Sequence, residues 1–302
     1  MTIAPAIASS GTAATRRSMF RVSVLIAAPA LLFAVLCGEP GNISASPRGQ
    51  TYLWKHGASS EPLQNRFAPP PGFRRVPAEK GSFAEWLRGL PLKPGRPNVL
   101  LYNGEAKRNQ DAHAAVVDMP IEPKNLFQCA DALMRMRAEY LYAVKRTGQI
   151  TFHATSGDLL PFSRWQAGQR PQVKGNRIDW IERRTPDGSY QGLTRYLEFV
   201  YTYSGTISLA RDTERAPFEK LQIGDLFLQS GSPGHAVMIV DAAEKSGVTA
   251  FLLAQSYMPA QEMHVLRNAQ HSGEWYRSDQ IDKELITPEW TFPRENLRRF
   301  PR

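Results

Sequence analysis

Hydrophobic and polar positions first indicate where helices lie. After Asn125, a suitable N-cap, apolar residues recur near the 3.6-residue helical period until Gly148 ends the pattern. This helix places Cys129 in about its first turn. Two further helices are predicted, a short one over 83–90 and a longer one over 192–209.

Short apolar runs then indicate strands. The run 235–241 is apolar almost throughout, which is typical of a strand covered on both faces. A loop ending in Ser246-Gly247 separates it from the next run. The predicted strands cover 98–102, 113–119, 150–153, 223–228, 235–241 and 251–257. A helix followed by antiparallel strands is typical of the α+β class.

The chain of 302 residues divides into three segments without an internal repeat. Residues 1–45 are predicted to be a signal peptide or an N-terminal membrane segment. Residues 46–97 are rich in Pro, Gly and Arg and are predicted to form an arm laid over the domain. Residues 98–302 are predicted to be a single α+β domain, with an irregular stretch after 153 that ends near Pro186.

The N-terminal segment has the layout of a bacterial export signal. Three arginines flank Met19, and the apolar stretch 22–36 follows, shorter than a membrane-spanning helix needs. Cleavage near Ala45 and lipidation of Cys37 are alternatives, as are an uncleaved anchor and a buried core helix. We therefore expect an exported protein, periplasmic or extracellular, which contacts the membrane only through an uncleaved or lipidated N-terminus.

Composition is ordinary for a globular protein, but the charge balance is basic. The chain has 37 Lys and Arg against 28 Asp and Glu, a formal net charge of +9. Basic charge favours anionic partners such as wall polymers or phospholipid headgroups, and a solvated basic surface is the alternative. No run of Lys and Arg is interleaved with aromatic residues, so we expect no nucleic-acid partner.

The chemistry centres on three residues that follow one another in a suggestive order. Cys129 lies near a helix N-terminus, where unpaired N–H groups favour a thiolate. His235 opens an apolar strand after a Pro-Gly turn and is placed to accept the thiol proton. Gln255 interrupts the next apolar strand, where its amide oxygen would orient the imidazole. If Cys37 leaves with the signal, Cys129 is the single thiol of the mature chain.

Each of these residues also has a structural interpretation. Cys129 would be a small buried hydrophobic residue, the commonest state of a free cysteine. His235 would be a strand-edge histidine bonded to the backbone, and Gln255 a satisfied buried amide. Their joint order favours the catalytic interpretation over the three separate ones.

Two motifs in the last third resemble the NlpC/P60 and CHAP papain-like amidases. The motifs are Ile223-Gly224-Asp225-Leu226-Phe227-Leu228 and Gly234-His235-Ala236-Val237-Met238-Ile239-Val240, with Ala254-Gln255-Ser256 on the following strand. The resemblance implies a papain-like helix and antiparallel sheet, with Cys129 as nucleophile, His235 as base and Gln255 as orienting residue. The long separation of Cys129 from His235 implies a large insertion.

Most of the chain is also similar to a bacterial secreted family, the domain of unknown function 4846. The phrases that carry this similarity are Leu101-Tyr102-Asn103-Gly104, Gln128-Cys129-Ala130-Asp131-Ala132, Ala138-Glu139-Tyr140-Leu141-Tyr142, Pro233-Gly234-His235-Ala236-Val237 and Ala254-Gln255-Ser256-Tyr257-Met258-Pro259-Ala260-Gln261. The similarity implies one structural unit and brings no activity with it.

Other candidate residues are weaker. Weak substrate-binding candidates are Asn109, Gln110, His113, Ser256 and Tyr257, of which Asn109 or Gln110 is an oxyanion-donor candidate. An aromatic groove or ordinary core packing would account for Trp165, Trp180, Tyr190 and Tyr257. The histidines lack metal-ligand spacing and no phosphate-binding glycine loop is present, so we expect neither a metal nor a cofactor.

Two functions remain at this point. The first is an exported cysteine amidase or peptidase that acts on cell-wall peptide, such as peptidoglycan peptide, or on a related amide. The second is a non-catalytic envelope-binding module of the same fold that holds a wall fragment, another anionic envelope component or a partner protein.

Overall fold

The structure is a computed structural model, and it describes residues 52–55 and 60–301. The predicted signal or membrane segment, 1–45, lies outside these residues, as does Cys37. None of the helices within the described ranges has both the length and the apolar character that a membrane crossing requires.

The described residues form α-helices and antiparallel sheets, which confirms the α+β class. The helices are α1 (Leu63–Arg66), α2 (Phe83–Arg88), α3 (Cys129–Ala143), α4 (Phe162–Gln166), α5 (Tyr190–Tyr203) and α6 (Thr206–Arg211). The strands are β1 (Glu61–Pro62), β2 (Arg74–Arg75), β3 (Pro91–Leu92), β4 (His113–Val116), β5 (Thr151–His153), β6 (Leu159–Pro161), β7 (Gln169–Lys174), β8 (Arg177–Glu182), β9 (Glu214–Arg215), β10 (Leu226–Gln229), β11 (His235–Lys245), β12 (Val248–Gln255), β13 (His264–Leu266), β14 (Tyr276–Arg277), β15 (Glu284–Ile286), β16 (Thr291–Pro293) and β17 (Leu297–Arg299).

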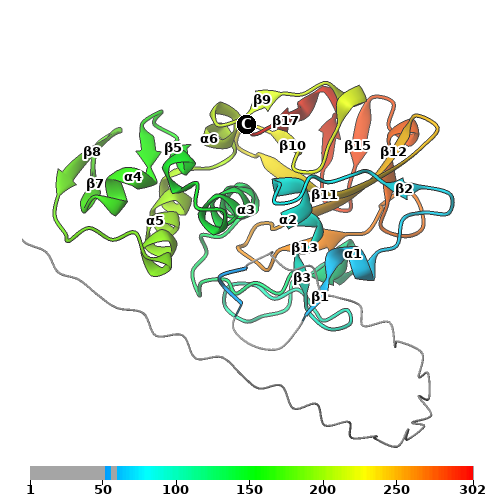
Figure 1. Cartoon of the computed structure of the whole chain (residues 1–302), viewed down its shortest axis with the longest axis horizontal. Coiled ribbons are helices and arrows are strands. Elements are labelled where there is room, and N and C mark those ends of the chain that lie inside the picture. Colours follow the sequence, from blue (N-terminus) through cyan, green and yellow to red (C-terminus); the bar gives the residue numbers. More distant parts are fainter. Residues whose placement is uncertain (1–51, 56–59, 302) are drawn as a thin grey trace, which may run out of the picture. The chain divides into compact units, whose positions relative to one another are not determined.

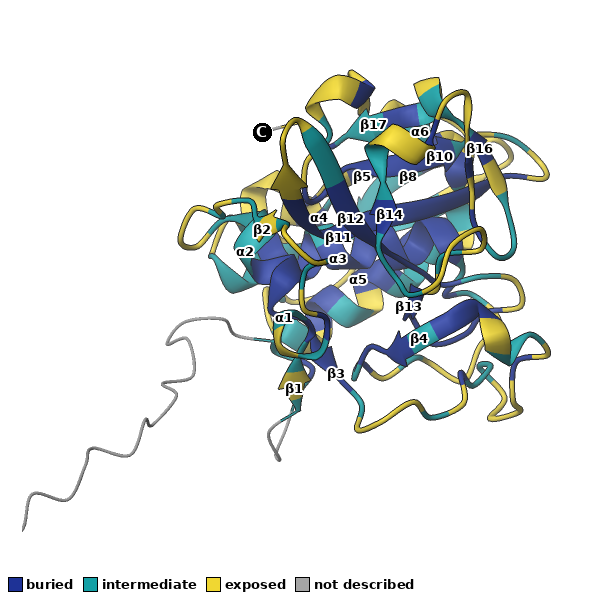
Figure 2. Ribbon diagram, turned by 90° about the vertical axis from the view of Figure 1, so that its right-hand side faces the viewer, coloured by how far each residue is buried: buried dark blue, intermediate teal, exposed yellow. Residues whose placement is uncertain are grey.

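The main sheet has the strand order β4-β13-β12-β11-β10-β17-β9, with β14 paired to β12 and β2 paired to β11. Its two longest strands, β11 and β12, form a hairpin closed by Ser246 and Gly247, both at positive φ. The register pairs Met238 with Ala254 and shifts between Ile239 and Asp241. Figure 2 shows these strands and α3 largely buried, because apolar residues fill both faces at the centre of the sheet.

Helix α3 packs against the β11 region of this sheet (Figure 1). On the other side of α3 lie α4, α5 and the β7–β8 hairpin, which belong to the segment between Cys129 and His235. The segment in which the sequence predicted a large insertion contains a small layer, with Phe162, Trp165 and Tyr196 packed between α4 and α5.

The segment 60–92 is tied into the sheet through one buried carboxylate. Asp241 in β11 is fully buried and accepts from Arg75 Nε at 2.8 Å and from Arg88 Nε at 2.7 Å. Leu63 and Leu87 of the same segment are completely buried in the common core. At the opposite end of the chain, Arg299 in β17 pairs with the buried Asp225.

Three predicted elements differ from the structure. Residues 98–102 form only isolated bridges, Leu100 with Ala106 and Leu101 with Gln261, rather than a strand. The helix predicted over 192–209 is two helices, α5 and α6, because Gly205 between them is extended. The stretch predicted to be irregular contains the regular hairpin β7–β8.

Candidate functional site

Cys129 is the first residue of α3. The sequence predicted an earlier start with Asn125 as N-cap, but the N-cap is Gln128, whose N–H donates to the Asp131 carboxylate at 3.0 Å. The Asn125 side chain instead accepts from the backbone N–H of Ala260 at 2.8 Å, which fixes the loop before the helix. Cys129 is therefore at the N-terminus itself, one turn earlier in its helix than the pattern indicated.

The thiol lines a cleft of about 540 Å³. The cleft is bounded by the loop and first turn of α3, the α5–α6 junction, the turn before β11 and the β12–β13 connection. Its lining residues are Asn125, Leu126, Gln128, Cys129, Ala130, Asp131, Tyr201, Ser204, Gly205, Thr206, Gly231, Ser232, Pro233, Gly234 and Met258.

The turn before β11 leaves no room for a side chain at Gly234. A Cβ there would lie 2.4 Å from Thr206 Oγ1 and 2.6 Å from the Gly231 carbonyl oxygen. The same Thr206 hydroxyl donates to that carbonyl at 3.0 Å, so α6 holds the turn in place. This close packing explains why a glycine precedes His235.

The environment of Cys129 favours the neutral thiol. Burial, together with the Asp131 carboxylate, raises the pKa of Cys129 to about 11. The N–H groups of Ala130, Ala236 and Cys129 itself act in the opposite direction but do not offset the burial. The helix N-terminus therefore does not produce the lowered pKa that the sequence led us to expect.

His235 and Gln255 are joined by a hydrogen bond between adjacent strands. His235 opens β11 and Gln255 ends β12, and His235 Nε2 lies 2.8 Å from Gln255 Oε1. Both residues have no exposed surface. Burial lowers the pKa of His235 to about 4, so its ring is neutral at neutral pH.

The His235 ring is enclosed by aromatic side chains. Its centroid is 4.7 Å from that of Tyr257, 5.3 Å from Trp290 and 5.7 Å from Phe292. Its Nδ1 is buried without a hydrogen-bond partner among the described residues. One nitrogen is thus fixed by Gln255, and the other is free to accept a proton.

The backbone next to His235, at the start of β11, contacts Cys129. The N–H of Ala236, the residue after His235, contacts the Cys129 sulfur. Within 60–301, however, no hydrogen bond joins the thiol to the imidazole. The Cys129 thiol and the His235 imidazole are therefore both uncharged at neutral pH and are not hydrogen-bonded to each other.

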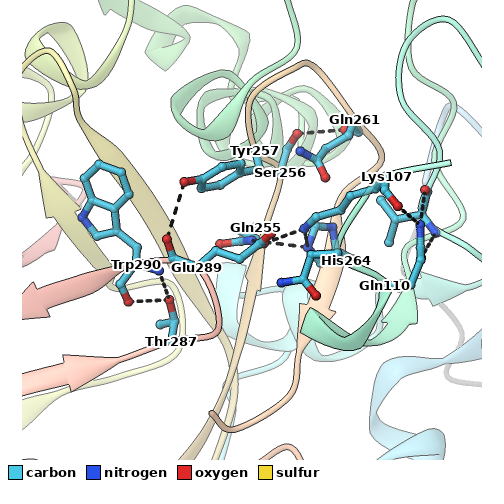
Figure 3. Close-up of polar contacts among 12 residues, drawn as sticks. Lys107, Gln110, Gln255, Ser256, Tyr257, Gln261, His264, Thr287, Glu289 and Trp290 are labelled. Atoms are coloured by element: carbon cyan, nitrogen blue, oxygen red, sulfur yellow. Dashed lines mark hydrogen bonds and ion pairs between the residues drawn. The ribbon is translucent and has the colours of Figure 1, made fainter. Parts of the chain in front are cut away.

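Behind Gln255 lies a buried polar cluster, which the sequence did not indicate (Figure 3). Gln255 Nε2 donates to Glu289 Oε2 at 2.8 Å and lies 3.3 Å from His264 Nε2. Lys107 pairs with the same Glu289 oxygen and also lies 3.3 Å from His264 Nε2. Lys107 and Glu289 come from loops distant in sequence and follow no motif, so no pattern in the sequence marks them.

Three of the weak substrate-binding candidates are engaged in holding other parts of the fold. Asn109 accepts from the N–H of Asp111 at the 3-10 turn Gln110–Ala112. Gln110 bonds both backbone groups of Val99, and His113 Nε2 lies 2.9 Å from the Pro97 carbonyl oxygen. The structure does not place these three among the residues lining the Cys129 cleft.

The other two candidates directly follow Gln255 in the chain. The Ser256 hydroxyl bonds the carbonyl oxygens of Phe127 and Gln261 at 3.1 and 2.8 Å, so it links the loop before α3 to the end of β12. Tyr257 packs edge-on against His235. Neither residue lines the cleft itself.

The aromatic residues considered for a groove do not gather in one place. Trp165 packs in the α4–α5 layer under Arg170, and the Tyr190 hydroxyl donates to the buried Glu139. Trp180 lies on β8, whereas Tyr257 lies next to His235. Core packing accounts for Trp165 and Tyr190.

A second cleft of about 1070 Å³ lies against β7 and α5, and Trp165 is among its lining residues. Four arginines line it: Arg170, Arg183, Arg184 and Arg195. Neither Cys129 nor His235 lines it. Its size alone does not connect it to the chemistry of the thiol.

Comparison with known families gives one match. The model of the family described as domain of unknown function (4846) matches residues 63–299, which include α1 to β17. Neither the curated proteins nor the solved structures contain a match to the chain.

Proposed function

The chain belongs to the family of the domain of unknown function 4846, and we propose that it is a cysteine hydrolase, an amidase or peptidase with a papain-like arrangement. Cys129 is the nucleophile, His235 the base and Gln255 the residue that orients the base. The observation that carries this proposal is the state of His235. One ring nitrogen is bonded to Gln255, and the other is unpartnered in the region of the Cys129 thiol.

The order of the elements supports a papain-like arrangement. A helix that begins at the cysteine packs against an antiparallel sheet, and two adjacent strands of that sheet supply the histidine and the amide. In such an arrangement the helix would supply the nucleophile, and the two strands would supply the base and the group that orients it.

The raised pKa of the thiol and the lowered pKa of the imidazole determine how the reaction would start. Both groups are uncharged at neutral pH, so proton transfer accompanies attack rather than preceding it. The Cys129 sulfur bonds to the substrate carbonyl carbon while its proton passes to His235 Nδ1. The imidazolium then protonates the leaving amine, and water hydrolyses the thioester with His235 again as base.

The oxyanion would be stabilised by backbone donors at the same helix terminus. The first N–H groups of a helix have no partner within it, and those of Cys129 and Ala130 face the sulfur. Donors placed where charge develops are among the largest contributions to such catalysis. They replace Asn109 and Gln110, whose contacts lie elsewhere.

Peptidoglycan peptide is the substrate class that best fits an exported basic protein. The Cys129 cleft and a neighbouring cleft of about 680 Å³ share Pro233, which gives an extended peptide room on both sides of the turn before β11. The arginines of the 1070 Å³ cleft would attract an anionic wall polymer. The periplasmic or extracellular location rests on residues 1–45.

A non-catalytic envelope-binding module is the second candidate. The observation that favours it is the absence of a Cys129–His235 hydrogen bond together with the raised pKa of the thiol. Catalytic hydrogen bonds are often long in a free enzyme and tighten with substrate, so the hydrolase remains the proposal.

The test uses a synthetic peptidoglycan stem peptide and purified wall sacculi. We expect the wild-type protein to release new amino groups, detected with an amine-reactive dye. Cys129→Ala should abolish release, and His235→Ala should reduce it by about 10²–10⁴-fold. Ser163→Ala, an exposed change on α4, serves as the matched control.

The two candidates give different results in calorimetry. A binding module would hold the fragments equally well with or without the Cys129 sulfur, and no variant would release amine. That outcome would reject the hydrolase. Absence of both release and binding would reject this substrate class.

A further inference from the structure

We propose that Glu289 is a positioning residue that fixes the orientation of the Gln255 amide and thereby selects the tautomer of His235. The catalytic meaning of this role rests on the proposed hydrolase, but the tautomer itself does not.

The contacts of the Gln255 side chain fix its direction. An amide has one accepting oxygen and one donating nitrogen, so its two ends are not interchangeable. Gln255 Nε2 lies 2.8 Å from Glu289 Oε2, and an ionised carboxylate only accepts. The buried ammonium of Lys107 pairs with the same oxygen and balances the charge of this carboxylate.

His264 reinforces the same direction. Its Nδ1 lies 2.9 Å from the Glu262 carbonyl oxygen, which only accepts, so Nδ1 carries the hydrogen. Its Nε2 is then a bare acceptor, 3.3 Å from Gln255 Nε2. Both neighbours of the amide nitrogen are acceptors, and a reversed amide would place its oxygen against a carboxylate and a lone pair.

The orientation of the Gln255 amide determines the tautomer of His235. With the amide nitrogen directed to Glu289, the Gln255 oxygen must face His235 Nε2, and the two atoms are 2.8 Å apart. His235 therefore carries its hydrogen on Nε2, and its buried, unpartnered Nδ1 is the basic nitrogen. A reversed amide would favour hydrogen on Nδ1, and that nitrogen could no longer accept the thiol proton.

Removal of the Glu289 carboxylate should reverse the orientation of the Gln255 amide. In Glu289→Leu, the buried Lys107 ammonium loses its partner and attracts the Gln255 oxygen instead, which leaves the amide NH₂ facing His235. Glu289→Gln is the matched control, because its side-chain oxygen still accepts from Lys107 and from Gln255. The double variant Lys107→Met/Glu289→Leu removes both buried charges and leaves only His264 to direct the amide.

The experiment is a long-range ¹H–¹⁵N NMR spectrum of the full chain with ¹⁵N-labelled histidine, recorded at neutral pH without substrate. We expect the Nε2–H tautomer for His235 in the wild type and in Glu289→Gln, and predominantly the Nδ1–H tautomer in Glu289→Leu. A folded Glu289→Leu protein that keeps the Nε2–H tautomer would overturn the proposal.

If Glu289→Leu does not fold, the His235 tautomer of the double variant Lys107→Met/Glu289→Leu tests the proposal instead. Mixed His235 tautomers in it support the role of Glu289, and a single Nε2–H tautomer contradicts it. Because no substrate is present, a wild-type protein with the expected tautomer but no hydrolysis would reject the hydrolase and leave this inference intact.

Discussion

At the scale of single residues, the site is governed by burial more than by the helix terminus. A cysteine at the first position of a helix receives stabilisation of its thiolate from backbone N–H groups. In this protein desolvation and Asp131 outweigh that effect and raise the pKa of Cys129. Burial likewise lowers the pKa of His235, so the same physical cause keeps both partners uncharged.

The raised pKa of Cys129 should be visible in the pH dependence of its alkylation. With a pKa of about 11, the thiol should react slowly with iodoacetamide at pH 7, and its rate should rise about tenfold per pH unit well beyond pH 8.5, where a free cysteine levels off. Mass spectrometry of the labelled protein across pH measures this profile.

Asp131→Asn supplies the matched comparison. Its amide oxygen can still accept from the Gln128 N–H, whereas the charge that raises the pKa of Cys129 is gone. The alkylation midpoint should therefore move to lower pH. An unchanged midpoint would mean that burial alone sets the titration.

At the scale of elements, the turn before β11 positions the base. Gly234→Ala would place a Cβ against Thr206 and the Gly231 carbonyl, which are hydrogen-bonded to each other across the turn. Overpacking of this kind costs about 1–3 kcal/mol. We expect a corresponding loss in the free energy of unfolding, measured by urea denaturation.

Gly148→Ala is the control for this change, since nothing lies within 4 Å of a Cβ there. It should alter stability by less than about 0.5 kcal/mol. Equal stability of Gly234→Ala and the control would show that the turn can rearrange, and that the glycine is not required by packing.

The sequence predicted those elements whose apolar pattern is continuous. The strand from His235 and the helix carrying Cys129 fall in this group, because each is buried along much of its length. The hairpin β7–β8 was missed because its residues are polar or half-buried and show no apolar run. The isolated bridges at Leu100 and Leu101 were overestimated as a strand because an apolar run does not show whether a partner strand is present.

The same difference between continuous patterns and isolated residues determines which site residues could be predicted from the sequence. Cys129 and His235 begin regular elements and Gln255 ends one, so a pattern in the sequence can single them out. Glu289 and Lys107 lie in loops, and only the folded chain brings them to Gln255. Residues of this kind, which contact the orienting residue Gln255 from elsewhere in the chain, come together only in the tertiary structure. No local pattern in the sequence therefore marks them.

At the scale of the whole molecule, the Pro-rich segment 46–97 bears on how the chain folds. The sequence predicts an arm laid over a domain that begins at residue 98. In the structure β2 pairs with β11, and Arg75 and Arg88 neutralise the fully buried Asp241. Four leucines of the segment, Leu63, Leu87, Leu90 and Leu92, are completely buried.

This arrangement predicts that a chain of residues 98–302 does not fold. Each lost leucine removes about 1.5–3 kcal/mol of burial, and an uncompensated buried charge such as Asp241 costs about 3–5 kcal/mol. The sum is comparable to the whole stability of a typical domain, about 5–15 kcal/mol. Circular dichroism should show a cooperative thermal transition for residues 47–302 and none for 98–302. A cooperative transition of 98–302 at a similar temperature would instead mean that the segment is a detachable cover, and that Asp241 finds other partners.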